Sequence, residues 1–261
     1  MSAKAFCTGF SSGKMVCSRS RFKNVLSNSK NRFLNMRPAF ILFDIDGTLL
    51  RIREGFMPKL IDVLLRKLGR ETFEVGSTSF AGRTDRDIFT QLLEANQLCT
   101  SNFDTLRQVY VDTLEEMLAP SDLDTLPGAA EAAAWCLEQG LPAGLLTGNF
   151  REAAFTKLSR AGLDSYFETG AFGGNHFDRN ELPEIAWEIG RSVVGNDLLP
   201  QNMVIIGDTP RDIGCAQHFG CKSVAVTTGP FSREELSRFG PDLVLDSLEA
   251  PQQWLTALLE K

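Results

Sequence analysis

Two carboxylates at the end of an apolar run, Asp44 and Asp46, are the residues of this sequence best placed to do chemistry. They follow the apolar residues 39–43 and precede Gly47 and Thr48. Such a run predicts a strand buried on both faces of a parallel sheet, which puts both carboxylates at the edge where open α/β sheets bind ligands. Carboxylates held this close need a cation, a shared proton or several hydrogen-bond donors. Taken alone, however, the pair is more simply an acidic turn in water.

Two later apolar runs also end in polar residues. One ends in Thr147, Gly148 and Asn149, and the other ends in Asp208, with Asp212 four residues further along. In a doubly wound sheet such strand ends can converge on one crevice. Three or four carboxylates in one crevice need a metal ion, and ligands that are all oxygen favour Mg²⁺.

Strands alternate with helices along most of the chain, which predicts an α/β fold with a doubly wound parallel sheet. After the first strand, helical periodicity continues without a clear strand, and Thr84 with Asp87 resembles a capping box at a helix start. We therefore predict a core of residues 38–55 and 128–261, interrupted by a helical insertion at 56–127. The further predicted strands are 142–149, 166–172, 203–208, 223–227 and 242–245, and the predicted helices are 57–68, 88–98, 103–118, 129–139, 151–161, 182–194, 212–219 and 254–259.

Charge and composition exclude several kinds of partner. Residues 1–37 carry eight Lys and Arg and no acidic residue, whereas the rest of the chain carries 19 basic and 33 acidic residues, a net charge of −14. An acidic body argues against nucleic acid, and no apolar run is long enough to suggest a membrane span. The six cysteines form no C-x-x-C pair, which argues against a thiolate zinc site and indicates reduced thiols inside a cell.

The basic N-terminal extension, residues 1–37, is expected to lie outside the fold. Its Ser-, Lys- and Arg-rich composition fits a disordered tail or an organelle transit peptide, and a true start at Met36 is an equal alternative. We expect an intracellular protein, located in the cytoplasm, or in a mitochondrion or plastid if the extension is a transit peptide. The sequence does not indicate an oligomeric state.

Three motifs together resemble the haloacid dehalogenase superfamily. They are FDIDGTLL at 43–50, LLTGN at 145–149 and IGDTPRD at 206–212, with the helical insertion between the first two. The arrangement is similar to the phosphoglycolate phosphatase-like branch of that superfamily. The resemblance covers about residues 38–261 and implies a Rossmann-like core with a helical cap.

The resemblance implies a role for each matching carboxylate. Asp44 is then the nucleophile that forms an aspartyl-phosphate, and Asp46 is the acid and base that serves the leaving group and the water. Mg²⁺ is then held by Asp44, the main-chain carbonyl of Asp46 and Asp208, with Asp212 in support. A bound metal offsets the repulsion between these carboxylates and a phosphate.

The same resemblance implies a set of phosphate-binding residues. The hydroxyl of Thr147 and the amide of Gly148, with Asn149 beside them, are expected to hold phosphoryl oxygens as charge builds. Arg83, in a Gly-Arg-Thr-Asp turn of the cap, is a candidate to bind a carboxylate or second phosphate of the substrate. An ordinary exposed turn is an equal alternative for Arg83.

One position departs from the family pattern. The family usually places a Lys about thirty residues after the threonine motif, and the segment 178–183 has none. Arg179 is the predicted replacement, because a guanidinium supplies the same charge and can hold two oxygens at once. Lys157 is a weaker candidate, since it is expected on the exposed face of its helix.

The predicted function is Mg²⁺-dependent hydrolysis of a small-metabolite phosphomonoester through an aspartyl-phosphate. A phosphosugar mutase of the same superfamily keeps both aspartates and returns the phosphate to the sugar, so it is the first alternative. A non-catalytic binding protein on the same scaffold is the second. The cap sequence does not identify the substrate.

Overall fold

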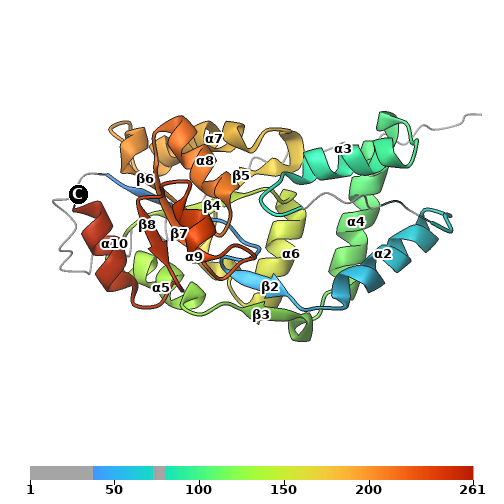
Figure 1. The fold of residues 1–261 in the computed structure, drawn as a ribbon, viewed down its shortest axis with the longest axis horizontal. Helices are drawn as coiled ribbons and strands as arrows, with labels where there is room; N and C mark the ends of the chain where they lie inside the picture. Colours follow the sequence, from blue (N-terminus) through green and yellow to red (C-terminus); the bar gives the residue numbers. More distant parts are fainter. Residues whose placement is uncertain (1–37, 73, 75–79, 261) are drawn as a thin grey trace, which may run out of the picture.

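A six-stranded parallel sheet forms the centre of the molecule (Figure 1). The computed structural model describes residues 38–72, 74 and 80–260, so the predictions made for residues 1–37 lie outside the described residues. The strand order is β5-β4-β1-β6-β7-β8, with every neighbouring pair parallel. The strands of this sheet are β1 (Phe40–Phe43), β4 (Ala143–Thr147), β5 (Gly170–Phe172), β6 (Met203–Gly207), β7 (Lys222–Val226) and β8 (Leu243–Leu245). The predicted doubly wound α/β fold is confirmed.

Helices cover both faces of the sheet, and the alternation of side chains along β1 shows why. Ile41 and Phe43 pack in the core on the side of α5, α6 and α10, whereas Phe40 and Leu42 pack on the side of α7 and α8. All four side chains are fully buried, as a strand between two helical layers requires. The described helices are α2 (Phe56–Lys67), α3 (Asp85–Ala95), α4 (Phe103–Met117), α5 (Ala129–Gln139), α6 (Arg151–Ala161), α7 (Leu182–Val193), α8 (Pro210–Phe219), α9 (Arg233–Ser237) and α10 (Pro251–Leu259).

The helices α2, α3 and α4 lie together at one end of the molecule, with α4 between the other two (Figure 1). They are inserted after β1, as the sequence predicts. A two-stranded antiparallel ribbon, β2 (Leu50–Ile52) and β3 (Leu123–Thr125), joins this helical cap to the core. The sequence pattern did not predict the ribbon, because its strands are only three residues long. The exact limits of the cap, 56 and 127, stay a prediction.

Two helix starts are fixed by the same side-chain chemistry. Thr84 precedes α3 and its hydroxyl accepts a hydrogen bond from the Asp87 amide, whereas the Asp87 carboxylate accepts from Arg83 and Gln91, so only the Thr84 half of the predicted capping box is present. Thr209 and Asp212 form a full capping box at the start of α8. None of the described helices is both long and apolar enough to cross a membrane. The four cysteines in the described part of the chain are free thiols.

Candidate active site

Three neighbouring strands bring the predicted polar residues to one edge of the sheet. The order β4-β1-β6 places Thr147, Asp44 and Asp208 at the carboxyl ends of adjacent strands, and all three side chains are buried. A cavity of about 640 Å³ opens between this edge and the cap helices. Motifs that lie 160 residues apart in the sequence, such as those of Thr48 and Asp208, therefore meet at one site.

The carboxylates of Asp44, Asp208 and Asp212 form the centre of the site. One oxygen from each lies within 4.8 Å of the others. Asp212 is already engaged, since its Oδ2 accepts hydrogen bonds from the amide and hydroxyl of Thr209, at 3.0 and 2.7 Å. In contrast, Oδ1 of Asp44 is buried without a hydrogen-bond partner among the described residues. Asp44 and Asp208 are thus freer than Asp212 to bind a metal.

Two glycines make room for the Asp208 side chain. Gly47 has a φ of 84°, and a Cβ at that position would lie 2.3 Å from Oδ2 of Asp208. A Cβ at Gly229 would lie 1.7 Å from the same oxygen. Any other residue at Gly47 would also be strained by the positive φ. The glycine of the DxDG motif therefore serves both the turn and the close approach of β6.

Burial dominates the electrostatics of these carboxylates. It raises the pKa of Asp44 to about 7, although the Arg179 guanidinium opposes the shift. Burial, with the added repulsion of Asp212 and Asp44, raises the pKa of Asp208 to about 9. Negative charge at this edge is therefore costly unless a cation compensates it.

The residues present fit Mg²⁺. Their donors are carboxylate oxygens, the ligands that this ion prefers. Arg179, which pairs with Asp44 and Asp212, offsets only part of the charge of three buried carboxylates. Asp44 and Asp208, with Asp212 beside them, would hold the ion. The ion would neutralise the charge that burial makes unfavourable.

This electrostatic arrangement predicts a pH-dependent effect of Mg²⁺ on stability. Because the raised pKa values of Asp44 and Asp208 exceed the value of about 4 for an unfolded Asp, the folded protein binds more protons than the unfolded chain at intermediate pH. Without metal, stability is therefore expected to fall as the pH rises from about 4 to about 9. Mg²⁺ should raise the melting temperature more at about pH 8 than at about pH 5. Melting curves in EDTA and in Mg²⁺ check this, and an equal shift at both pH values would contradict it.

Arg179, the predicted replacement for the family lysine, lies beside Asp44, the predicted nucleophile. Its Nη2 is 3.1 Å from Oδ1 of Asp44 and also pairs with Asp212. The same guanidinium donates to the main-chain carbonyls of Gly82 and Leu146, at 3.2 and 3.3 Å. Arg179 is buried and lines the cavity. It is thus held in place by the cap and the core together.

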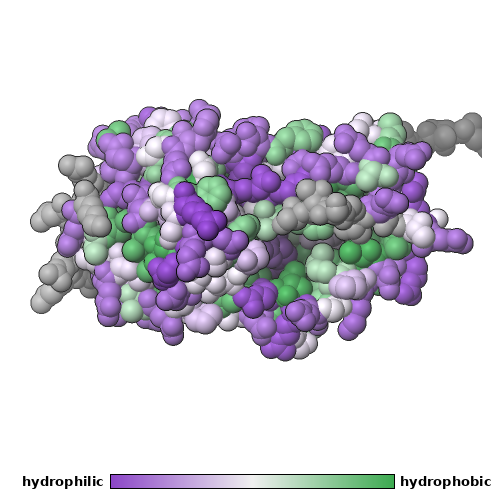
Figure 2. Space-filling view, in the orientation of Figure 1, coloured by the Kyte–Doolittle hydropathy of each residue, from purple (hydrophilic) through white to green (hydrophobic). Residues whose placement is uncertain are grey.

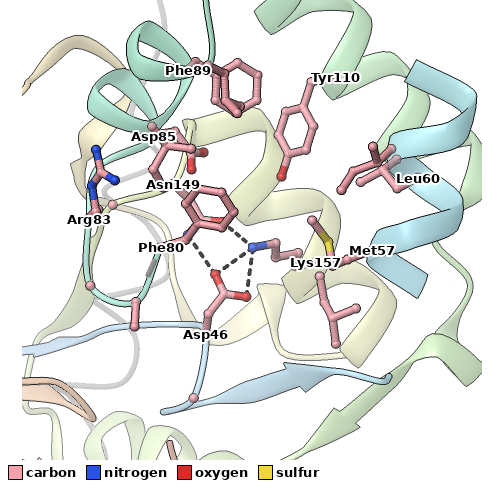
Figure 3. A pocket seen from close by; sticks show the side chains of 18 of the residues that line it. Asp46, Met57, Leu60, Phe80, Arg83, Asp85, Phe89, Tyr110, Asn149 and Lys157 are labelled. Carbon is pink, nitrogen blue, oxygen red and sulfur yellow. Dashed lines mark hydrogen bonds and ion pairs between the residues drawn. The ribbon is translucent and has the colours of Figure 1, made fainter. Parts of the chain in front are cut away.

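Lys157 is also buried, so the prediction that it lies on an exposed helix face is wrong. It shares the buried stripe of α6 with Ala154 and Leu158. Its ammonium lies 2.6 and 2.9 Å from the two carboxylate oxygens of Asp46 and also donates to Oδ1 of Asn149 (Figure 3). The helix stripe turns Lys157 toward the site, where it holds the Asp46 carboxylate in position.

Given the predicted role of Asp46 as acid and base, replacing Lys157 by methionine is expected to lower kcat for phosphate release by about 10²-fold, because Asp46 then loses the group that positions it. The variant Lys157→Arg should also be slow, since a planar guanidinium does not replace a compact ammonium bound by three oxygens. The control is Lys222→Met, which removes an ammonium that donates to the Leu258 carbonyl, away from the cavity. Steady-state kinetics on Lys157→Met and Lys222→Met check this prediction, and equal kcat values for the two variants would contradict it.

The threonine motif presents a donor to the site. The hydroxyl oxygen of Thr147 accepts hydrogen bonds from the amide and the side chain of Asn149, at 3.4 and 3.1 Å, which leaves the hydroxyl hydrogen available to a phosphoryl oxygen. The Asn149 side chain also donates to Oδ2 of Asp46 at 2.8 Å. The Gly148 carbonyl accepts from the Asp85 amide at 2.7 Å. Asn149 therefore connects Thr147 to Asp46 by hydrogen bonds.

The cap contributes two residues next to the cavity. Arg83 is buried and pairs with Asp87 at 2.7 Å, so the alternative of an exposed turn is wrong. Asp85, which the sequence did not single out, accepts a hydrogen bond from the Phe150 amide at 2.6 Å. Burial raises the pKa of Asp85 to about 6, although Lys157 opposes the shift. An acidic residue in the first turn of a helix is common, so the sequence held no signal that sets Asp85 apart.

This fold and these strand-end residues define a class of protein, and comparison with known families agrees. The sequence profile of the haloacid dehalogenase-like hydrolases matches residues 41–226. The chain belongs to this family. The chain is therefore a hydrolase with a doubly wound core, an inserted helical cap and a cluster of carboxylates.

Individual relatives are distant. The chain is similar to a pyrophosphatase PpaX from Bacillus thuringiensis (strain Al Hakam), with 24% identity over 215 residues, 82% of this chain and 94% of the relative. A structure of a predicted phosphoglycolate phosphatase from Haemophilus somnus has 18% identity and a TM-score of 0.63, over 85% of this chain and 99% of that one. CbbY from Rhodobacter sphaeroides, in complex with phosphate, has 19% identity and a TM-score of 0.64, over 82% and 96%. These structures share the fold with the present chain.

Proposed function

We propose that this hydrolase is a Mg²⁺-dependent phosphatase that cleaves a phosphomonoester through an aspartyl-phosphate on Asp44. The observation that carries the proposal is the buried Asp44 carboxylate, with one oxygen lacking a hydrogen bond, beside Arg179 and Asp208 at the end of a cavity. The names of the similar pyrophosphatase and of the phosphoglycolate phosphatase structure support the same chemistry.

In the first step, a carboxylate oxygen of Asp44 attacks phosphorus and the bond to the ester oxygen breaks. Asp46 donates a proton to the leaving oxygen, and the Thr147 hydroxyl donates a hydrogen bond to a phosphoryl oxygen. Arg179 offsets the negative charge around Asp44. Mg²⁺, when bound, supplies further neutralisation of charge on the carboxylates and the phosphate.

In the second step, a water attacks the phosphorus of the aspartyl-phosphate. Asp46, now a carboxylate, accepts the proton of that water, and the bond between phosphorus and Asp44 breaks. Inorganic phosphate leaves, and both aspartates return to their starting forms. Lys157 and Asn149 hold the Asp46 carboxylate at the cavity floor. Asp46 can therefore reach the leaving oxygen in the first step and the attacking water in the second.

A panel of phosphomonoesters, together with inorganic diphosphate and a hexose 1-phosphate, tests this proposal. Purified protein with Mg²⁺ should release phosphate from at least one monoester, and EDTA should stop the release. No release from any member would contradict the proposal. Conversion of the hexose 1-phosphate to an isomer without free phosphate would instead identify a mutase.

A further inference from the structure

The cavity has two ends of different chemistry. Its floor is polar and contains Asp46, Asn149 and Lys157, whereas its walls in the cap are mainly apolar, apart from Arg83 and Asp85. The wall residues come from all three cap helices and include Leu60, Leu64, Leu68, Ile88, Leu92 and Leu106. Figure 3 shows the transition, with Asp46 and Lys157 at the floor and Met57 and Leu60 on the adjoining wall.

The apolar walls are regular helix faces. Leu60, Leu64 and Leu68 recur every fourth residue at one side of α2, and Ile88 and Leu92 do so on α3. A stripe of this kind normally packs against protein. Here Leu64, Leu68, Ile88 and Leu92 are only half-buried and line the cavity. On the face shown in Figure 2, hydrophobic residues gather where α2 lies. Leu64, Leu68 and Ile88 also pack against the core, so within the described residues the two helices present partly exposed apolar side chains to the same space.

The position of the leaving oxygen in the proposed mechanism indicates which part of the substrate meets this apolar surface. Because Asp46 protonates the leaving oxygen in the proposed mechanism, the alcohol part of the ester lies on the Asp46 side of the phosphate. From Asp46 the cavity continues past Lys157 and the ring of Tyr110 toward the leucine wall of α2 (Figure 3). The alcohol part therefore enters the apolar end.

The charges along this path disfavour a second anionic group. Three cations that line the cavity are paired with carboxylates: Lys157 with Asp46, Arg83 with Asp87, and Arg179 with Asp44 and Asp212. A fourth, Arg51, is exposed and donates to the Thr228 carbonyl. The Asp85 carboxyl adds negative charge on the cap side of the cavity when it ionises. A diphosphate or a phosphorylated acid would place its second anion among these carboxylates, where repulsion is strong. An uncharged apolar group meets no such penalty.

We infer that the substrates are phosphomonoesters of alcohols with an apolar group, aliphatic or aromatic, which lies between α2 and α3. This inference rests on the proposed phosphatase function and specifies its substrate class. A cavity of about 640 Å³ is in the range that binds a whole small molecule, with apolar walls and a few polar groups for orientation. Removal of the apolar group from water supplies the binding energy.

A homologous series of n-alkyl phosphates tests the inference. Ethyl, butyl and hexyl phosphate have leaving groups of similar acidity, so their chemical steps are comparable. With Mg²⁺ present, kcat/KM is expected to rise about three- to fourfold for each methylene buried, or on the order of 10²-fold from ethyl to hexyl phosphate. Equal values along the series, or a decrease, would overturn the inference.

Two leucine variants locate the effect. Leu64→Gln puts a polar side chain on the cavity wall and should lower the hexyl-to-ethyl ratio of kcat/KM by about tenfold. Leu137→Gln makes the same change at an exposed position of α5, outside the cavity lining, and should keep the wild-type ratio. An unchanged ratio in Leu64→Gln would overturn the placement of the apolar group between α2 and α3.

Binding of phosphonates separates the inference from the proposed function. Calorimetric titration of the full chain with ethylphosphonate and hexylphosphonate, in Mg²⁺, needs no turnover. If no ester is hydrolysed but hexylphosphonate binds at least about tenfold more tightly, the phosphatase proposal fails and the ligand class stands. If the esters are hydrolysed at equal rates and both phosphonates bind equally, the ligand class fails and the phosphatase proposal stands.

Discussion

Replacing Asp44 by asparagine is expected to lower phosphate release by at least about 10⁴-fold, because the amide cannot form the aspartyl-phosphate. Stability should not fall with activity. Burial raises the pKa of Asp44 to about 7, which means that the folded protein disfavours its ionised form at higher pH. The neutral asparagine removes this cost and keeps the shape of the side chain. In EDTA at about pH 8 the variant should therefore unfold at the same or a higher temperature than the wild type.

Phosphate-release kinetics and melting curves in EDTA measure the two effects separately. Asp164→Asn is the matched control, since Asp164 is exposed in a short turn away from the cavity, and it should match the wild type in both measurements. Activity of Asp44→Asn above about one hundredth of the wild-type rate would exclude Asp44 as the nucleophile. A much lower melting temperature would show that the carboxylate serves the fold instead.

Removing the charge of Arg179 is expected to have the largest effect on stability. Arg179→Met leaves the buried carboxylates of Asp44 and Asp212 without their cation, and breaking a buried ion pair on one side costs about 3–5 kcal/mol. Urea unfolding in EDTA should show a loss of this size. Mg²⁺ should recover part of it, because the ion would bind the same cluster of carboxylates.

A surface arginine provides the control for this experiment. Arg191 lies 3.6 Å from Glu188 on one face of α7, with both side chains partly exposed, so Arg191→Met should cost less than about 1 kcal/mol. Arg179→Lys should recover only part of the stability, since an ammonium keeps the charge but lacks the second nitrogen, Nη1, with which the guanidinium also donates to the Gly82 carbonyl. Equal losses in Arg179→Met and Arg191→Met would show that Arg179 does not compensate the buried cluster.

The sequence determined the order and type of the strands and helices, because the patterns that predict them are local. Continuous apolar runs before Asp44 and Asp208 predicted buried parallel strands, and the structure places them as the neighbours β1 and β6. Helical periodicity predicted α6 to the residue, 151–161. Parallel strands with helices on both faces leave only one edge at which polar strand ends can meet. The position of the site could therefore be predicted from the order of elements and from motif spacing.

The tertiary structure alone decided that Lys157 and Asp85 belong to that edge. Lys157 is one position on a helix, and its partner Asp46 lies 111 residues away, so no local pattern relates them. The buried stripe of Ala154 and Leu158 was the available signal, but a lysine on such a stripe can also extend to solvent. Asp85 reaches the site because α3 of the cap begins against Gly148 of the core.

The pair Asp44 and Asp46 shows the same division between what the sequence predicts and what packing decides. The sequence placed Asp44 and Asp46 at one strand end, and the later motifs predicted different roles for them. Packing gave them different surroundings: Asp44 is buried against Arg179, and Asp46 turns to Lys157 and Asn149 in the cavity. Side chains two residues apart can face different neighbours, and only the assembled elements supply those neighbours. The sequence by itself therefore determined where the chemistry lies and proposed Arg179 as the cation there, and the tertiary structure decided that Lys157 pairs with Asp46.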